Sequence, residues 1–139
     1  ATVQIQVLLL LRELQREFGL ATIFVTHDIG VAVEVADRIA VMYAGRIVET
    51  GPVREVIRNP RHPYTIGLLR ARMGHAQARG VRLEAIPGAP PDLSALPPGC
   101  AFAPRCRFAA PPCSATDPEE AALAPGHLVR CLRTEATAA

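Results

Sequence analysis

The 139-residue sequence contains no lysine, and all 15 of its basic residues are arginines. A phosphate-binding P-loop requires a lysine directly after its glycines, because that side chain reaches the nucleotide phosphates. The chain therefore contains no P-loop. If these residues take part in handling a nucleotide, the cradle for its phosphates comes from elsewhere.

Long apolar runs and strong net charge are also missing. The longest apolar run near the start, Val7 to Leu11, is interrupted by Arg12 and Glu13, whereas a membrane-spanning helix needs about 20 apolar residues. No basic stretch precedes an apolar one, as it does in a signal peptide. The net charge of +2 is too small to indicate nucleic-acid binding. We expect a soluble, cytoplasmic chain without a nucleic-acid partner.

The stretch from Ala21 to Asp28 is the first candidate for a functional site. Ala21 to Val25 is a short apolar run between two helical patterns, which predicts a buried strand of a parallel sheet. Thr26, His27 and Asp28 then stand at the carboxyl end of that strand, where ligands bind in open α/β sheets. His27 is thus a candidate ligand-contacting residue. The alternative is a structural histidine at a strand end.

Local patterns predict the elements on either side. Apolar spacing predicts a helix over 3–18, with Val3, Val7, Leu10, Leu11, Leu14 and Phe18 on one stripe. Asp28 is expected to cap a helix over 29–36. A strand over 38–43, a turn at 44–45 and a return strand over 46–50 form a hairpin. Helices follow from residue 53 and from 63 to about 73. Because the first helix begins at once, we expect an upstream portion.

The composition changes after residue 73. Prolines and glycines predict a linker over 74–98, since their spacing excludes long helices. The linker leads into a small four-cysteine module over 99–133, followed by a frayed tail over 134–139. The whole chain is thus expected to be α/β, with residues 1–73 as its main folded part and a Cys-rich irregular module at the end.

All four cysteines lie in that module: Cys100, Cys106, Cys113 and Cys131, spaced C-x5-C-x6-C-x17-C. So small a module with so many prolines needs a metal or disulfides to be stable. Nothing indicates secretion, so a four-thiolate metal site is favoured. The wide gaps favour an iron–sulfur cluster over zinc, whose structural sites have closer cysteine pairs. Free thiols, labile disulfides and substitution by His127 remain alternatives.

Several motifs resemble one known family. The matching stretches are Ala1 to Gln15, Ile23 to Asp28, Ala36 to Glu49, His62-Pro63-Tyr64-Thr65 and the Gly-Cys-x-Phe-x-x-Arg-Cys run from Gly99 to Cys106. Together they resemble the C-terminal part of the ATP-binding subunits of ABC importers for oligopeptides, dipeptides and nickel, over essentially the whole chain. Thr-His-Asp alone has little specificity, but the combination of motifs is specific.

The resemblance implies a P-loop-type nucleotide-binding domain of which this chain is the C-terminal part. His27 would match the switch-loop histidine that contacts the γ-phosphate of ATP. The family's Walker A loop, Q-loop, signature motif, Walker B acid and catalytic glutamate would precede residue 1, and with them most contacts to ATP and Mg²⁺. We therefore expect no ATP hydrolysis by these residues alone. Partners would be permease subunits and a second ATPase subunit, at the cytoplasmic face of the membrane.

Two functions thus compete. The first is the C-terminal part of an ATPase that powers uptake of peptides or a related solute. The second is a non-enzymatic metal- or iron–sulfur-binding module that regulates or stabilises a partner. A truncated product without independent function is a third possibility. Tyr43 and Tyr64 are expected to be packing residues rather than adenine ligands.

Overall fold

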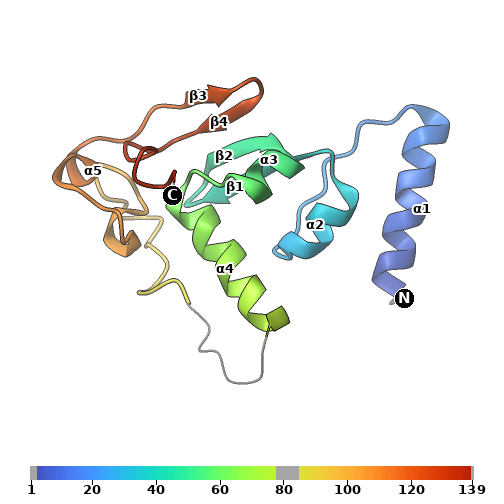
Figure 1. The fold of residues 1–139 in the computed structure, drawn as a ribbon, viewed down its shortest axis with the longest axis horizontal. Helices are drawn as coiled ribbons and strands as arrows, with labels where there is room; N and C mark the ends of the chain where they lie inside the picture. The colour runs from blue at the N-terminus through green and yellow to red at the C-terminus, as the bar shows by residue number, and fades with distance from the viewer. Residues whose placement is uncertain (1–2, 78–84, 139) are drawn as a thin grey trace.

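The computed structural model describes residues 3–77 and 85–138 and mixes helices with an antiparallel sheet (Figure 1). No described helix has both the length and the apolarity needed to cross a bilayer. The elements in chain order are α1 (Val3–Phe18), α2 (Ile29–Val35), β1 (Arg38–Tyr43), β2 (Arg46–Pro52), α3 (Val53–Arg58), α4 (Pro63–Gln77), the 3₁₀ turn η1 (Ala103–Arg105), α5 (Pro111–Ala115), β3 (Ala121–Ala124) and β4 (His127–Val129).

The hairpin of β1 and β2 forms where it was predicted. Tyr43 pairs with Arg46, and two residues connect the strands. Both connecting residues have positive φ, 49° at Ala44 and 77° at Gly45. This backbone matches a type I′ turn, whose twist suits the twist of paired strands. The sequence signal at Gly45 therefore correctly identified a hairpin, although Ala44 holds a conformation that alanine seldom adopts.

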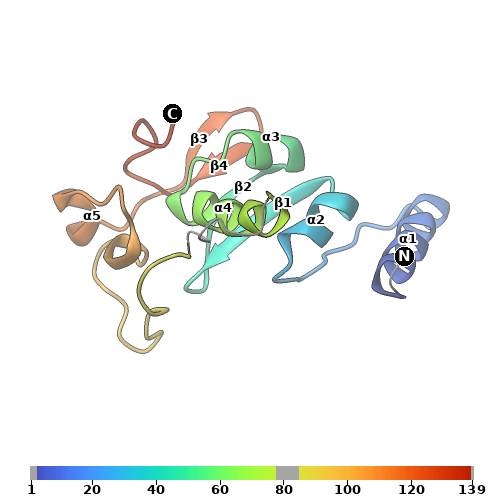
Figure 2. The same cartoon turned by 60° about the horizontal axis from the view of Figure 1, so that its bottom comes forward.

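The sheet is completed by residues close to the C-terminus. Its strand order is β1-β2-β4-β3 (Figures 1 and 2). Glu49 and Thr50 of β2 pair with Val129 and Leu128 of β4. The Arg130 N–H also donates to the Val48 carbonyl at 2.8 Å. The hairpin is thus fixed on one side by a strand from the Cys-rich part of the chain, which no local pattern indicated.

The core lies between this sheet, α3, α4 and the Cys-rich segment. Its buried members are Val41, Tyr43, Val48, Val56 and Phe102. Phe102 stands between the first two cysteines and is 4% exposed. Helix α4 runs to Gln77, past the expected end near residue 73. The Cys-rich segment therefore contributes directly to the core of the hairpin.

The predicted buried strand over 21–26 is wrong for the described structure. Residues 20–26 form no regular element, and Ile23 and Val25 are 94% and 90% exposed. A strand requires hydrogen-bonding neighbours, and no described strand lies against this segment. The apolar, β-branched composition was therefore not sufficient to form a strand here.

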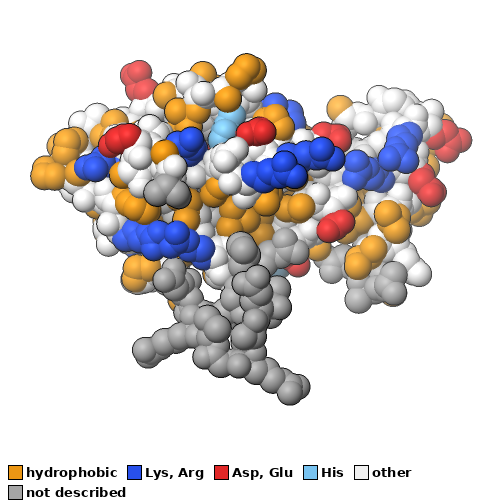
Figure 3. Space-filling view, viewed as in Figure 1, with side chains coloured by type: hydrophobic (Ala, Val, Ile, Leu, Met, Phe, Trp, Pro, Cys, Tyr) orange, Lys and Arg blue, Asp and Glu red, His pale blue; other side chains and the backbone are white. Residues whose placement is uncertain are grey.

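Helix α1 has the predicted bounds but stands apart from the sheet (Figures 1 and 2). Its Leu8 is buried, and its Arg12 donates to the Glu34 carbonyl at 2.8 Å and lies 3.8 Å from the Asp37 carboxylate. The apolar stripe is largely uncovered: Leu10 is 55% and Phe18 65% exposed. Figure 3 shows apolar side chains on the surface at this end of the molecule.

Candidate functional site

His27 lies at an exposed bend between the extended segment and α2. The bend is fixed by its neighbours. The Asp28 carboxylate accepts from the Gly30 N–H at 2.8 Å, and the Asp28 N–H donates to Thr26 Oγ1 at 3.0 Å. The predicted helix cap at Asp28 is confirmed. Among the described residues, His27 has no hydrogen-bond partner, so its imidazole is free to meet a ligand.

The four cysteines line one small cavity of about 20 Å³. Three parts of the chain bring them there: Cys100 and Cys106 flank η1, Cys113 lies on α5, and Cys131 follows β4. Their thiols are free. The 17 residues between the last two cysteines thus complete α5 and form the β3–β4 hairpin, which carries the fourth thiol back to the other three.

A close backbone contact holds the first and third cysteines together. The Cys100 N–H donates to the Cys113 carbonyl at 2.8 Å. A Cβ at Gly99 would lie 2.4 Å from the same oxygen, which is closer than two such atoms can approach. Glycine is therefore required at position 99 for the loop to lie against α5.

Burial and backbone hydrogen bonds shift the pKa of the cysteine thiols in opposite directions. Burial raises the pKa of Cys100 and Cys106 and raises that of Cys131 to about 11, so these three thiols are protonated near neutral pH when no metal is bound. Backbone N–H groups counteract this effect. That of Arg133, for example, donates to Cys131 Sγ at 3.3 Å. Such donors are typical of thiolates that bind a metal or cluster.

The four cysteine sulfurs are suitable ligands for a metal, but their arrangement is not that of a complete coordination shell. Within 3–77 and 85–138, no group of three or more His, Cys, Asp or Glu side chains is arranged to hold a metal ion. A cavity of about 20 Å³ has room for little more than one water-sized body. Its size thus suits a single ion, whereas a cuboidal cluster would require the loops to move apart.

Glu49 is a buried residue whose importance the sequence did not indicate. Its carboxylate is 1% exposed and accepts three hydrogen bonds: from the Arg61 N–H at 2.8 Å, from the His62 N–H at 2.9 Å and from His127 Nε2 at 2.8 Å. His127, considered above as a substitute metal ligand, is instead bound to this carboxylate. The one signal in the sequence was an acidic residue directly after the apolar Ile47-Val48 pair of a predicted strand.

His62 is the helix cap of the His-Pro-Tyr-Thr motif. Its Nδ1 accepts from the Tyr64 N–H at 3.1 Å, and its carbonyl accepts from the Ile66 N–H at 3.1 Å, which starts α4. Pro63 suits the first helical position because it has no N–H to leave unpaired. Burial lowers the pKa of His62 to about 4, so the ring is neutral.

Aromatic rings join this motif to the hairpin and to the Cys-rich segment. The Tyr43 ring centroid lies 4.6 Å from that of Tyr64 and 5.1 Å from that of Phe102. The packing role expected for both tyrosines is confirmed. The motif therefore organises the interface between α4, the sheet and the cysteine cavity.

Part of the chain is similar to a known family and to known transport proteins. Residues 48–113 match the family described as oligopeptide/dipeptide transporter, C-terminal region. A putative peptide import ATP-binding protein of Brucella ovis is 54% identical over 99% of the chain and 42% of its own length. The oligopeptide transport ATP-binding proteins OppD of Salmonella typhimurium and Mycobacterium tuberculosis are 47% and 46% identical, over 39% and 22% of their lengths. The chain thus spans less than half of each of these relatives.

Proposed function

We propose that the chain is the C-terminal part of an ATP-binding subunit that powers peptide import, because residues 48–113 match the oligopeptide/dipeptide transporter C-terminal region family. The main support for this proposal is the 54% identity to a putative peptide import ATP-binding protein over 99% of the chain. ATP and Mg²⁺ would be bound mostly by segments outside these 139 residues, in keeping with the absence of lysine.

In this proposal His27 contacts the terminal phosphate of ATP. The free imidazole at a bend fixed by Asp28 supports this role. A donor held in place before the reaction stabilises the charge that develops on the transferred phosphoryl group, because no reorganisation is needed at that moment. The exposed segment before His27 would pair with strands of the remaining part of the nucleotide-binding domain.

The test is ATP hydrolysis by a subunit reassembled from this chain and the N-terminal part of the Brucella ovis relative. We expect activity only with both parts, and a loss of about 100-fold or more in kcat for His27→Ala, as for removal of one oxyanion donor. Arg54→Gln, at an exposed position on α3, is the control and should retain full activity. Full activity of the His27 variant would contradict the role of His27. No activity in any combination would count against the transport assignment.

We further propose that Cys100, Cys106, Cys113 and Cys131 hold an iron–sulfur cluster or zinc. The shared cavity and the N–H donor to Cys131 support a thiolate site. A bound zinc would staple the three parts of the chain, and a cluster could also carry electrons. The second candidate function, a non-enzymatic metal-binding module that stabilises a partner, depends on this site and not on His27.

Anaerobic purification followed by elemental analysis and a visible absorption spectrum separates the alternatives. About four irons per chain with broad visible absorption would identify a cluster. One zinc without colour would identify a structural metal. Four titratable thiols without metal would contradict the site but leave the transport proposal standing.

The proposed partners are the permease subunits and a second ATP-binding subunit, identical or different. The chain would then act at the cytoplasmic face of the membrane as a peripheral subunit. Co-purification of the reassembled subunit with the permease from detergent would test this arrangement. A subunit that hydrolyses ATP but never retains the permease would contradict it.

A further inference from the structure

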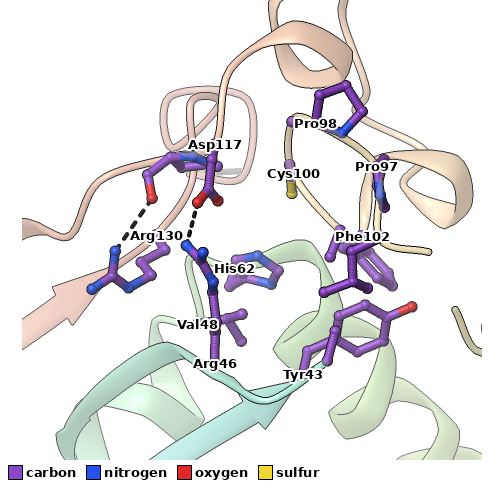
Figure 4. A pocket seen from close by; sticks show the side chains of 15 residues that line it. Tyr43, Arg46, Val48, His62, Pro97, Pro98, Cys100, Phe102, Asp117 and Arg130 are labelled. Carbon is purple, nitrogen blue, oxygen red and sulfur yellow. Dashed lines mark hydrogen bonds and ion pairs between the residues drawn. The ribbon is translucent and has the colours of Figure 1, made fainter. Parts of the chain in front are cut away.

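A second, larger cavity opens beside the cysteine cavity and has no part in the function proposed above. Its volume is about 140 Å³. It lies where the β1–β2 turn meets the loop before Cys100 and the segment that follows α5 (Figure 4). An empty cavity of roughly 150 Å³ admits a benzene-sized molecule. The space therefore suits a branched or aromatic group of a few carbon atoms.

One side of this cavity is apolar. The rings of Tyr43 and Phe102 and the proline pair Pro97-Pro98 face it, with Val48 at the base (Figure 4). Phe102 and Tyr43 are buried in the core and pack edge to face at 5.1 Å between centroids. This wall is held rigidly by the core, so an apolar group could enter it without rearranging it.

The opposite side is polar and positively charged. Arg46 rises from β2 and pairs with Asp117, while Arg130 donates to the Pro118 carbonyl at 3.4 Å (Figure 4). The third nitrogen-bearing side chain at the cavity is His62, which is neutral because burial lowers its pKa to about 4. Two arginines and one aspartate thus line this side of the cavity. Each guanidinium has five N–H donors, so donors remain for an incoming anion.

We propose that this cavity binds a small carboxylate with an apolar tail. The tail would lie against Tyr43 and Phe102, and the carboxylate would accept from Arg46 and Arg130. A carboxylate is favoured because guanidinium groups bind its two oxygens with matching geometry, and because one negative charge balances the excess of one positive charge at the rim. A free branched-chain acid and the C-terminal residue of a peptide share this chemistry.

Titration of the 139-residue chain by NMR tests the proposal. The probes are isovalerate, the tripeptide Gly-Gly-Leu and its C-terminal amide. We expect saturable shifts of the Tyr43 ring and Leu96 methyl signals with a carboxylate, and at least about tenfold weaker binding of the amide, because charged hydrogen bonds are lost. Tighter binding of isovalerate would identify a free acid as the ligand, and tighter binding of the tripeptide would identify a peptide terminus.

Arginine variants complete the test. Arg46→Gln and Arg130→Gln should each weaken binding about tenfold, whereas Arg54→Gln on the exposed face of α3 should leave it unchanged. Arg46 is 55% exposed at its side chain, so its replacement should not disturb the fold. No saturable shift with any probe, equal binding of the amide, or equal weakening by Arg54→Gln would each overturn the proposal. None of these results bears on the transport function.

Discussion

At the residue scale, one buried carboxylate connects three parts of the chain. Glu49 lies on β2, Arg61 and His62 precede α4, and His127 begins β4. In water each of these donors would be hydrogen-bonded to solvent, so the buried carboxylate must replace three partners at once. Its role is structural, and it makes the cap of α4 and the pairing of β4 depend on the same side chain.

Removal of this carboxylate should be costly. Glu49→Ala leaves three buried donors unpaired, and we expect the free energy of unfolding to fall by about 3 kcal/mol or more. Urea denaturation followed by circular dichroism gives the value. Glu120→Ala, at an exposed position just before β3, should change stability by less than about 0.5 kcal/mol. Equal effects of the two variants would show that the Glu49 hydrogen bonds contribute little.

The cap of α4 should make stability depend on pH. The pKa of His62 falls from 6.5 to about 4 on folding, so the unfolded chain binds a proton more tightly than the folded chain. The stabilising contribution is complete above pH 6.5 and is lost as the pH falls toward 4. The loss is about 3 kcal/mol, from 1.4 kcal/mol per pKa unit.

Denaturation curves measured between pH 7 and 4 check this dependence. His62→Asn retains a side-chain oxygen that can cap the helix but does not titrate in this range. The variant should therefore show a smaller loss of stability over the same interval. An identical pH profile in both proteins would assign the dependence to other groups.

At the scale of elements, local signals were sufficient for some predictions and not for others. The hairpin of β1 and β2, the bounds of α1 and the Asp28 cap follow from interactions within a few residues, and all three are confirmed. Residues 21–26 show the limit of such signals, since strand formation needs a partner elsewhere. The pairing of β4 with β2 was missed for the same reason, because β4 has only three residues and its partner lies about 80 positions earlier.

The candidate site, too, could be predicted from the sequence only in part. The cysteines were found because cysteine spacing can be read directly, and they do surround one cavity. The contact between His127 and Glu49 was not predicted, because the two residues lie on strands far apart in the sequence. A sequence shows which side chains are present. Whether a histidine binds a metal or another side chain depends on contacts between residues that are far apart in the chain.

The β1–β2 turn offers a test of backbone strain. Ala44 has φ of 49°, where asparagine and glycine are favoured in type I′ turns. Ala44→Asn should therefore raise stability by about 0.5 kcal/mol, and Gly45→Ala should lower it by about 1–2 kcal/mol. Thermal unfolding of both variants measures whether each substitution raises or lowers stability. A loss with Ala44→Asn would indicate that the alanine side chain contributes packing that outweighs its strain.

At the scale of the whole molecule, the cysteine cavity and the sheet form one connected structure. Cys131 follows β4 by two residues, and Phe102, between Cys100 and Cys106, lies in the core with Tyr43 and Val48. A metal bound by the four cysteines would therefore stabilise the hairpin as well as the loops. A two-stranded hairpin alone is at best marginally stable in water.

Metal removal should accordingly lower the melting temperature of the whole sheet. We expect a decrease of at least about 5 °C after chelation, since 1 kcal/mol corresponds to about 4 °C in a chain of this size. Scanning calorimetry of loaded and stripped protein measures it. Cys113→Ser, which removes one proposed ligand, should abolish the difference. A difference that persists in this variant would place the stabilising metal elsewhere.

The strand order also has a consequence for synthesis on the ribosome. The hairpin is made before β4, and the open edge of β2 cannot be covered until residues 127–129 have been translated. At roughly 5–20 residues per second, the nascent chain therefore carries an unpaired strand edge for about 4–15 seconds. During that interval, the uncovered β2 edge and the exposed apolar side chains of α1 would be accessible together. A general chaperone that binds extended apolar segments would therefore find one more binding site, the open β2 edge, in the half-made protein than in the finished one.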